Sequence, residues 1–201
     1  AADTGPTLEA LAGAVAAPGG ARKAWVSGAH AAYDQFARPG SLTIYGKLDL
    51  SAVVAEVQKQ VREDAGILTD SGTFARWVHR FYRDTAPHTQ AGPMSGAMGY
   101  AAPGALGATL ARPGAQTIAF VGDGGFLMSG QEIVAAVQHR LPVKLIVCDN
   151  TAWGSILVSQ QRRFGEDGTF GTRLESPDFA AVGAAHGVPS FAVETTEQFP
   201  D

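Results

Sequence analysis

The chain has 201 residues, of which 45% are hydrophobic and 17% charged, enough to bury the core of one globular domain beside an extra segment. Its net charge of −4 excludes the strongly basic surface that binds nucleic acid, and no run of about 18 apolar residues is present to span a membrane. The first residues lack the pattern of a signal peptide and the single cysteine excludes an internal disulfide, so we expect a cytoplasmic protein.

The first 40 residues differ in pattern from the rest of the chain. Two alanine-rich stretches, 7–17 and 22–36, predict helices separated by Pro18-Gly19-Gly20. Pro39-Gly40 then gives a turn signal. We therefore expect residues 1–40 to form a segment apart from a main domain over 41–201.

From residue 48 onward, helical and strand patterns alternate. Helices are predicted over 48–62, 73–83, 96–110, 129–140 and 177–186, and strands over 66–69, 117–121, 143–148 and 191–194. Short apolar strands separated by helices of this length predict an α/β fold, a doubly wound parallel β-sheet flanked by helices. Ligands of such sheets bind beyond the carboxyl ends of the strands, where the strand order reverses.

Two of these strand ends carry residues suited to a phosphate and a metal. Gly122-Asp123-Gly124-Gly125 follows one strand, and its glycines allow backbone N–H groups to approach a phosphate. A carboxylate makes sense beside that phosphate if a cation lies between them. Asn150, an oxygen ligand after the next strand, lies 27 positions beyond Asp123. That spacing fits one crossover, so both side chains are expected at the same edge of the sheet.

Plainer explanations exist for each of these residues alone. Asp-Gly is a common turn, and an Asp-Asn pair after a strand often caps the following helix. The five histidines show no metal-ligand spacing, and Cys148 inside an apolar strand is expected to be buried and inert. A dinucleotide-binding motif, Gly-x-Gly-x-x-Gly, would require its third glycine at position 127, where this chain has Leu127.

The combination resembles the thiamin diphosphate motif, in which Gly-Asp-Gly is followed at this distance by Asn-Asn. Here Asp149 replaces the first Asn, whereas the family's metal ligand corresponds to the second, Asn150. The resemblance runs from about 48 to 199 and points to the group of acetolactate synthase, benzaldehyde lyase and benzoylformate decarboxylase. Segments 70–74, 95–108 and 171–179 also carry it.

The resemblance implies a site for thiamin diphosphate and Mg²⁺. The Asp123 carboxylate, the Asn150 amide oxygen and the Ala152 main-chain carbonyl would bind the metal. Gly96 and Met98 are the implied catalytic residues, because they would contact the cofactor's pyrimidine and Met98 would support its bend, although a lone Met also fits core packing. The implied cofactor-binding residues are Ser71, Gly72, Thr73, Phe74, Gly96, Met98, Gly122, Asp123, Gly124, Gly125, Asn150, Ala152, Trp153 and Gly154.

The implied activity is that of a lyase or transferase, a decarboxylase or carboligase that releases CO₂ or forms C–C bonds through a cofactor ylide. Its substrate would be a 2-oxo acid or an aldehyde. Ser159 stands where acetolactate synthases carry a tryptophan, and segments 153–157 and 171–175 are more similar to benzaldehyde lyase. The choice between these reactions therefore stays open, and the alternative is a non-catalytic α/β binding or regulatory domain.

The family's activating glutamate has no counterpart in this sequence. The resemblance places it in an N-terminal pyrimidine-binding domain, in the same polypeptide or in a separate subunit. We therefore expect this chain to supply part of an active site, in a homodimer or homotetramer. Residues 1–40 would be the tail of a preceding middle domain or a linker, and the main domain would be shortened at its C-terminus.

Overall fold

The protein is described by a computed structural model that covers residues 3–15, 19–44 and 46–199. It divides into two compact units, Ala1–Ser41 and Leu42–Asp201. The first unit holds the helices α1 (Thr4–Ala14) and α2 (Gly20–Phe36), where the sequence predicts helices over 7–17 and 22–36. Residues 16–18, which include the predicted break at Pro18, lie outside the described residues.

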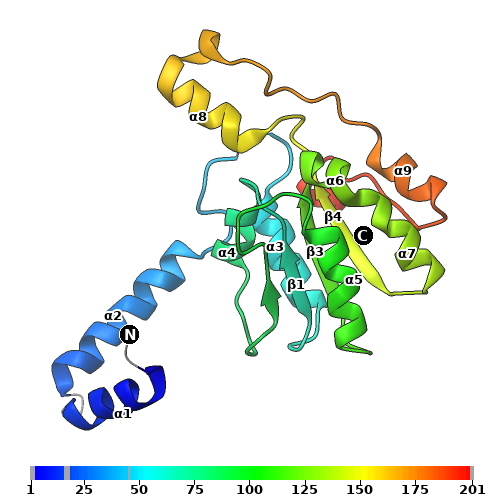
Figure 1. Cartoon of the computed structure of the whole chain (residues 1–201). Helices are drawn as coiled ribbons and strands as arrows, with labels where there is room; N and C mark the ends of the chain where they lie inside the picture. The colour runs from blue at the N-terminus through cyan, green and yellow to red at the C-terminus, as the bar shows by residue number, and fades with distance from the viewer. Residues whose placement is uncertain (1–2, 16–18, 45, 200–201) are drawn as a thin grey trace. The chain divides into compact units, whose positions relative to one another are not determined.

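The second unit is built on a sheet of four parallel strands (Figure 1). They are β1 (Gly66–Thr69), β2 (Gln90–Ala91), β3 (Thr117–Gly122) and β4 (Val143–Cys148), in the spatial order β2-β1-β3-β4. The predicted parallel α/β fold is confirmed. The chain moves outward from β1 to β2 and then crosses back to β3, so the order reverses between β1 and β3.

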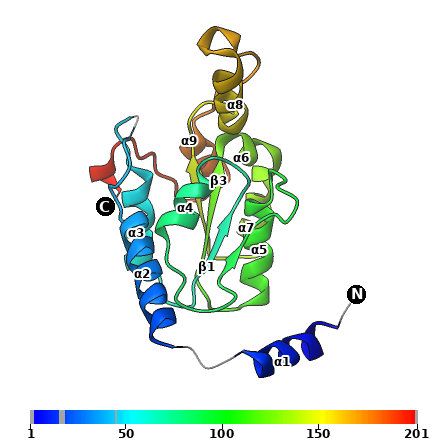
Figure 2. The same ribbon diagram turned by 90° about the vertical axis from the view of Figure 1, so that its left-hand side faces the viewer.

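Helices cover both faces of this sheet. The helices α3 (Leu50–Gln60) and α4 (Ala75–Phe81) lie on one face, and α5 (Ala101–Ala111), α6 (Asp123–Ser129), α7 (Ile133–Gln138) and α9 (Phe179–Ala185) belong to the other. Figure 2 shows α3 and α4 on one side of the strands and α5 and α7 on the other. The helix α8 (Gly154–Phe164) follows β4, and short 3₁₀ turns occupy Gly130–Glu132, Glu166–Gly168 and Thr196–Gln198.

Alternation along β3 fills two separate cores, because successive side chains of a strand point to opposite faces. Ile118 and Phe120 belong to the core beneath α3 and α4. Ala119 and Val121 belong to the core beneath α5 and α6. All six residues of β3 are buried, as expected for a central parallel strand covered on both faces.

The boundaries differ from the predictions where glycines control the backbone. The helix predicted over 96–110 begins only at Ala101, because Gly96 and Gly99 have φ of 69° and 83°, outside the helical region. The helix predicted over 129–140 corresponds to the 3₁₀ turn Gly130–Glu132 and α7, which begins at Ile133. A separate helix that was not predicted, α6, begins at Asp123, so Asp123, Gly124 and Gly125 of the motif form its first turn.

The strand predictions contain two further errors. Residues 191–194 form no strand, and Phe191 is 86% exposed, so this apolar stretch has no sheet neighbour to pair with. The two-residue strand β2 lies between the helices predicted over 73–83 and 96–110, where no strand was predicted. Among the described helices, none has both the length and the apolar composition needed to cross a bilayer.

The core assignment predicts a large difference between two phenylalanine truncations. Phe120→Ala should lower the free energy of unfolding by roughly 3–5 kcal/mol, because it leaves a cavity where a fully buried ring stood. Phe170→Ala is the matched control, since that ring is 87% exposed and should change stability by less than about 0.5 kcal/mol. Denaturant unfolding of both variants measures the difference, and similar losses would contradict the assigned core.

Candidate functional site

An aspartate follows each of the three longer strands at their common edge. Asp70 follows β1, Asp123 follows β3, and Asp149 follows β4. The register pairs Gly122 with Cys148, so β3 and β4 end at the same level. These carboxylates therefore lie around the point between β1 and β3 where the strand order reverses, the usual ligand position of such sheets.

The Asp123 carboxylate is the centre of the candidate metal site. It is 4% exposed, its Oδ1 accepts a hydrogen bond from the Gly124 N–H at 2.8 Å, and its Oδ2 accepts one from the Ala152 N–H at 3.1 Å. The same Ala152 N–H lies 3.2 Å from the Asn150 Oδ1. The structure thus brings together the three predicted ligand residues, with the two side-chain oxygens converging on one N–H group.

Burial and charge both act on Asp123. Burial raises the pKa of its carboxyl above the ordinary value, and the neighbouring Asp149 raises it further, while the N–H donors of Gly124 and Ala152 oppose the shift. Burial, together with the charge of Asp123, raises the pKa of the Cys148 thiol to about 12. The thiol therefore stays protonated at neutral pH, which agrees with the inert role expected for it.

The loop after β4 turns sharply at Trp153. The Gly154 N–H donates to the Ala152 carbonyl at 2.8 Å, which closes a three-residue turn at the start of α8. The Ala152 carbonyl keeps a second lone pair beyond this bond. A Cβ on Gly154 would lie 2.8 Å from the Asn150 Nδ2 and 3.0 Å from the Thr73 Oγ1. Thr73 and Asn150 therefore face the start of α8 together.

Protein side chains press against the glycines of the motif. A Cβ on Gly122 would lie 2.9 Å from the Phe74 ring, one on Gly124 would collide with the Trp153 ring, and one on Gly125 would collide with the Asp70 carboxylate. The sequence explains these glycines by the approach of a phosphate alone. The structure adds a second reason, because Phe74, Trp153 and Asp70 need the same space.

The Asp70 carboxylate organises the neighbouring loop. It is 1% exposed and accepts three backbone N–H groups, from Ser71 at 2.8 Å, Gly99 at 2.8 Å and Tyr100 at 3.2 Å. Three donors satisfy most of what a buried carboxylate requires. The end of β1 is thereby tied to the segment that leads into α5.

The Gly99 peptide is held from both sides. Its N–H donates to Asp70, and its carbonyl accepts from the Ser129 hydroxyl at 2.8 Å, at the end of α6. A Cβ on Gly99 would lie 3.2 Å from the Met128 Cβ, so α6 passes close to this peptide. Met98 precedes it and is partly exposed, between two glycines of positive φ. The loop that carries Met98 is thus fixed to both β1 and α6.

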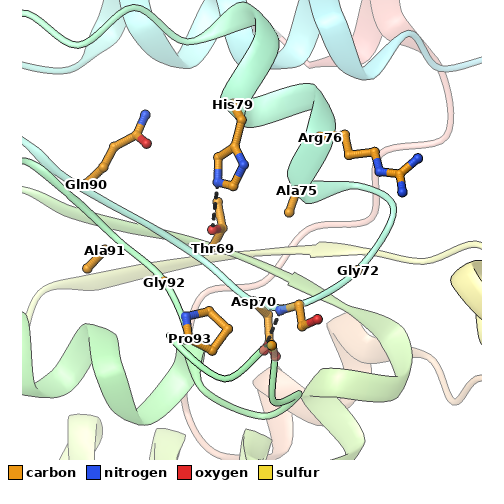
Figure 3. Close-up of a pocket in the computed structure, with 12 residues that line it drawn as sticks. Thr69, Asp70, Gly72, Ala75, Arg76, His79, Gln90, Ala91, Gly92 and Pro93 are labelled. Atoms are coloured by element: carbon orange, nitrogen blue, oxygen red, sulfur yellow. Dashed lines mark hydrogen bonds between the residues drawn. The ribbon is translucent and has the colours of Figure 1, made fainter.

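A pocket of about 500 Å³ opens beside β1 and α4 (Figure 3). Inside it, the Thr69 hydroxyl and the His79 Nε2 are hydrogen-bonded at 3.3 Å. The pocket contains three predicted residues, Ser71, Gly72 and Gly96, but Asp123 and Asn150 are not part of its lining. Its lining residues are Thr69, Asp70, Ser71, Gly72, Ala75, Arg76, His79, Gln90, Ala91, Gly92, Pro93 and Gly96.

Sequence reasoning missed Asp70 and Ser129 as members of this site. Asp70 carried a usable signal, since it follows a buried strand just as Asp123 does. Ser129 carried none, because its bond to Gly99 spans 30 positions. In the part of the chain that the structure describes, no three His, Cys, Asp or Glu side chains form a metal-binding group, so the candidate ligands are one carboxylate with neutral oxygens.

Comparisons with known proteins give a family match and several relatives. The profile of the family described as "Thiamine pyrophosphate enzyme, C-terminal TPP binding domain" matches residues 70–201. The acetolactate synthase large subunit of Pyropia yezoensis is 31% identical over 146 residues, covering 72% of this chain and 25% of that protein. Sulfoacetaldehyde acetyltransferase of Castellaniella defragrans is 34% identical over 152 residues, 72% of this chain and 24% of that protein.

A solved structure shows the same fold. The thiamine diphosphate-dependent 4-hydroxybenzoylformate decarboxylase of Rhodococcus jostii RHA1 superposes with a TM-score of 0.71 and 26% identity, over 79% of this chain and 30% of that one. This chain therefore spans about a quarter of the curated relatives named above.

Replacing Asp70 by its isostere should destabilise the domain. Asp70→Asn exchanges one acceptor oxygen for an NH₂ group that faces backbone donors, which should cost roughly 1–3 kcal/mol. Asp178→Asn is the matched control, because Asp178 caps α9 through a single bond to the Ala181 N–H and Asn caps equally well. Equal unfolding free energies for the two variants would rule out the organising role of Asp70.

Asp149→Asn should instead raise the free energy of unfolding of the metal-free chain. It keeps an acceptor oxygen but removes the carboxylate whose hydrogen bond and charge both raise the pKa of Asp123, so the ionised Asp123 carboxylate costs less at neutral pH. The gain should stay below about 1 kcal/mol, because Asp149 is exposed and solvent screens it.

The gain should disappear as pH falls through the raised pKa of Asp123. Below that pH the folded state holds Asp123 protonated, so no repulsion with Asp149 remains to be relieved. Thermal unfolding of both forms across acidic and neutral pH, without divalent cations, measures this effect. A gain that is the same at every pH would argue against repulsion as its source.

Proposed function

The chain belongs to the thiamine pyrophosphate enzyme family as a C-terminal cofactor-binding domain of acetolactate synthase-like enzymes, and we propose that it binds thiamin diphosphate through Mg²⁺. It would supply the diphosphate-binding part of an active site that acts on a 2-oxo acid or an aldehyde. When bound, thiamin diphosphate supplies the electron sink for breaking or forming a C–C bond beside a carbonyl carbon. This chain's residues would hold and orient it.

The convergence of Asp123 and Asn150 on the Ala152 N–H carries the proposal. Mg²⁺ prefers oxygen ligands in an octahedron and usually takes few of them from the protein. The Asp123 carboxylate, the Asn150 amide oxygen and the Ala152 carbonyl provide such a set. A buried carboxylate whose pKa is raised by burial and by a second carboxylate is also one that a divalent cation would relieve.

The diphosphate would lie against the first turn of α6. The first N–H groups of a helix have no acceptor inside it, and in α6 these include Gly125. Ser71, Thr73 and Phe74 follow β1 at the same edge, and Thr73 faces Asn150 across Gly154. We propose that these residues, with Gly72, Gly122, Gly124, Trp153 and Gly154, form the diphosphate-binding surface.

The pyrimidine half of the cofactor would be oriented by the loop of Gly96 and Met98. Asp70 and Ser129 fix that loop through the Gly99 peptide, so the backbone groups of Gly96 and Met98 hold a set position. Gly96 also lines the pocket beside β1, which provides room next to these backbone groups. We propose Gly96 and Met98 as the residues of this chain that act nearest the reacting atoms.

The remaining parts of the active site would come from outside this chain. We propose an N-terminal pyrimidine-binding domain with the activating glutamate, and assembly as a homodimer or homotetramer. Residues 1–40 would be the tail of a preceding domain or a linker. The relatives are named as a synthase, an acetyltransferase and a decarboxylase, so a lyase or transferase acting on a 2-oxo acid is the proposed class.

Calorimetric titration with thiamin diphosphate, with and without Mg²⁺, tests the proposal. Binding should require Mg²⁺ and should weaken roughly 100-fold or more in Asp123→Asn, because the amide cannot neutralise the cation. Asp64→Asn is the matched control, since Asp64 is an exposed aspartate before the start of β1, at the opposite edge of the sheet.

Binding of thiamin diphosphate that needs neither Mg²⁺ nor the Asp123 carboxylate would contradict the proposed metal site. If the chain alone binds nothing, the titration is repeated on the polypeptide that also carries the N-terminal domain. Absence of binding there would favour the alternative, a non-catalytic domain that has kept the fold.

A further inference from the structure

The Asp149 carboxylate joins two segments that the chain separates by α8. Its Oδ1 accepts a hydrogen bond from the Thr151 N–H at 2.8 Å and another from the Ser176 hydroxyl at 2.8 Å. Ser176 lies 27 positions further along the chain and has no role in the site described above. One carboxylate oxygen therefore connects the metal loop, residues 149–153, to the segment 172–176.

The two segments also run side by side. The Trp153 N–H donates to the Thr172 carbonyl at 2.9 Å, and the Leu174 N–H donates to the Thr151 carbonyl at 2.9 Å. These bonds form an antiparallel bridge between Ala152 and Arg173. The segment 172–176 thus supports the metal loop on both sides of Ala152.

The supported loop has an unfavourable backbone conformation. Thr151 has φ of 53°, which is rare and strained for a β-branched residue. Its N–H is bound to Asp149, its carbonyl to Leu174, and its hydroxyl donates to the Asn150 carbonyl at 2.8 Å. These contacts keep Thr151 in this conformation, which in turn directs the Ala152 N–H toward Asp123 and Asn150.

We propose that Ser176 is a positioning residue for the metal site, acting through Asp149 to hold Thr151 and Ala152 in the metal-binding conformation. This inference rests on the proposed function for the identity of the metal and the cofactor. Without the Ser176 bond, the Asp149 carboxylate can rotate into solvent, since it is exposed, and Thr151 loses the acceptor that restrains its N–H. The loop would then sample conformations in which Asn150 and Ala152 no longer face Asp123.

Amide hydrogen exchange in the metal-free chain tests the link directly. Ser176→Ala should speed exchange of the Thr151 amide about three- to tenfold, the factor expected for one lost hydrogen bond, while amides of β3 stay unchanged. Ser176→Thr keeps the hydroxyl and should restore slow exchange. Ser159→Ala is the matched control, because the Ser159 hydroxyl also donates one hydrogen bond, but to the Ser155 carbonyl within α8.

The Mg²⁺ dependence of cofactor binding tests the functional consequence. At a fixed concentration of thiamin diphosphate, Ser176→Ala should raise the Mg²⁺ concentration for half-saturation about three- to tenfold, and Ser159→Ala should not. Unchanged Thr151 exchange in Ser176→Ala, or an equal effect of Ser159→Ala, would overturn the proposal. If the wild-type protein binds no cofactor, the proposed function fails, whereas the exchange result still decides whether Ser176 holds the loop.

Discussion

The buried carboxylate of Asp70 is the constraint on which the candidate site depends. A charge that is almost fully buried must be surrounded by donors, and here three backbone N–H groups from two segments provide them. Meeting that requirement draws the loop before α5 onto the end of β1. It also leaves room only for glycine at position 125, so the first turn of α6 is shaped by the same side chain. The loop of Met98 and the motif of Asp123 are therefore placed by one buried charge.

The three aspartates at the strand ends differ in how completely the protein satisfies them. Asp70 accepts three backbone N–H groups, which suits a structural role. Asp123 is also buried, and this burial first, and then a second carboxylate, raise the pKa of its carboxyl, while two N–H groups oppose the shift. Asp149 is exposed and uses one oxygen to connect two segments. The same residue type at the same kind of position thus gives a support, a candidate metal ligand and a connector, according to burial and the number of donors.

The sequence predicts the parts of the site that depend on local pattern. The convergence of Asp123 and Asn150 follows from the length of one crossover, and the parallel sheet follows from the alternation of strands and helices. Gly96 and Met98 were identified only through a family resemblance. Asp70 carries a local signal, since it follows a buried strand, but the bonds made by Asp70, Ser129 and Ser176 span 27 to 30 positions, and no local pattern identifies the partners in such bonds. The strand predicted over 191–194 failed because an apolar stretch becomes a strand only beside a neighbour.

The bridge between Ala152 and Arg173 has a consequence for how this protein can diverge. The bridge holds together the two ends of the segment that contains α8. Residues 155–171 therefore form an insertion whose two ends are fixed next to each other. The entropy of closing a loop rises only with the logarithm of its length, so such an insert can lengthen, shorten or exchange its exposed apolar side chains at small cost. Ile156, Phe164 and Phe170 are such side chains. Mutation can therefore remodel this insertion while the loop proposed to bind the cation keeps its shape.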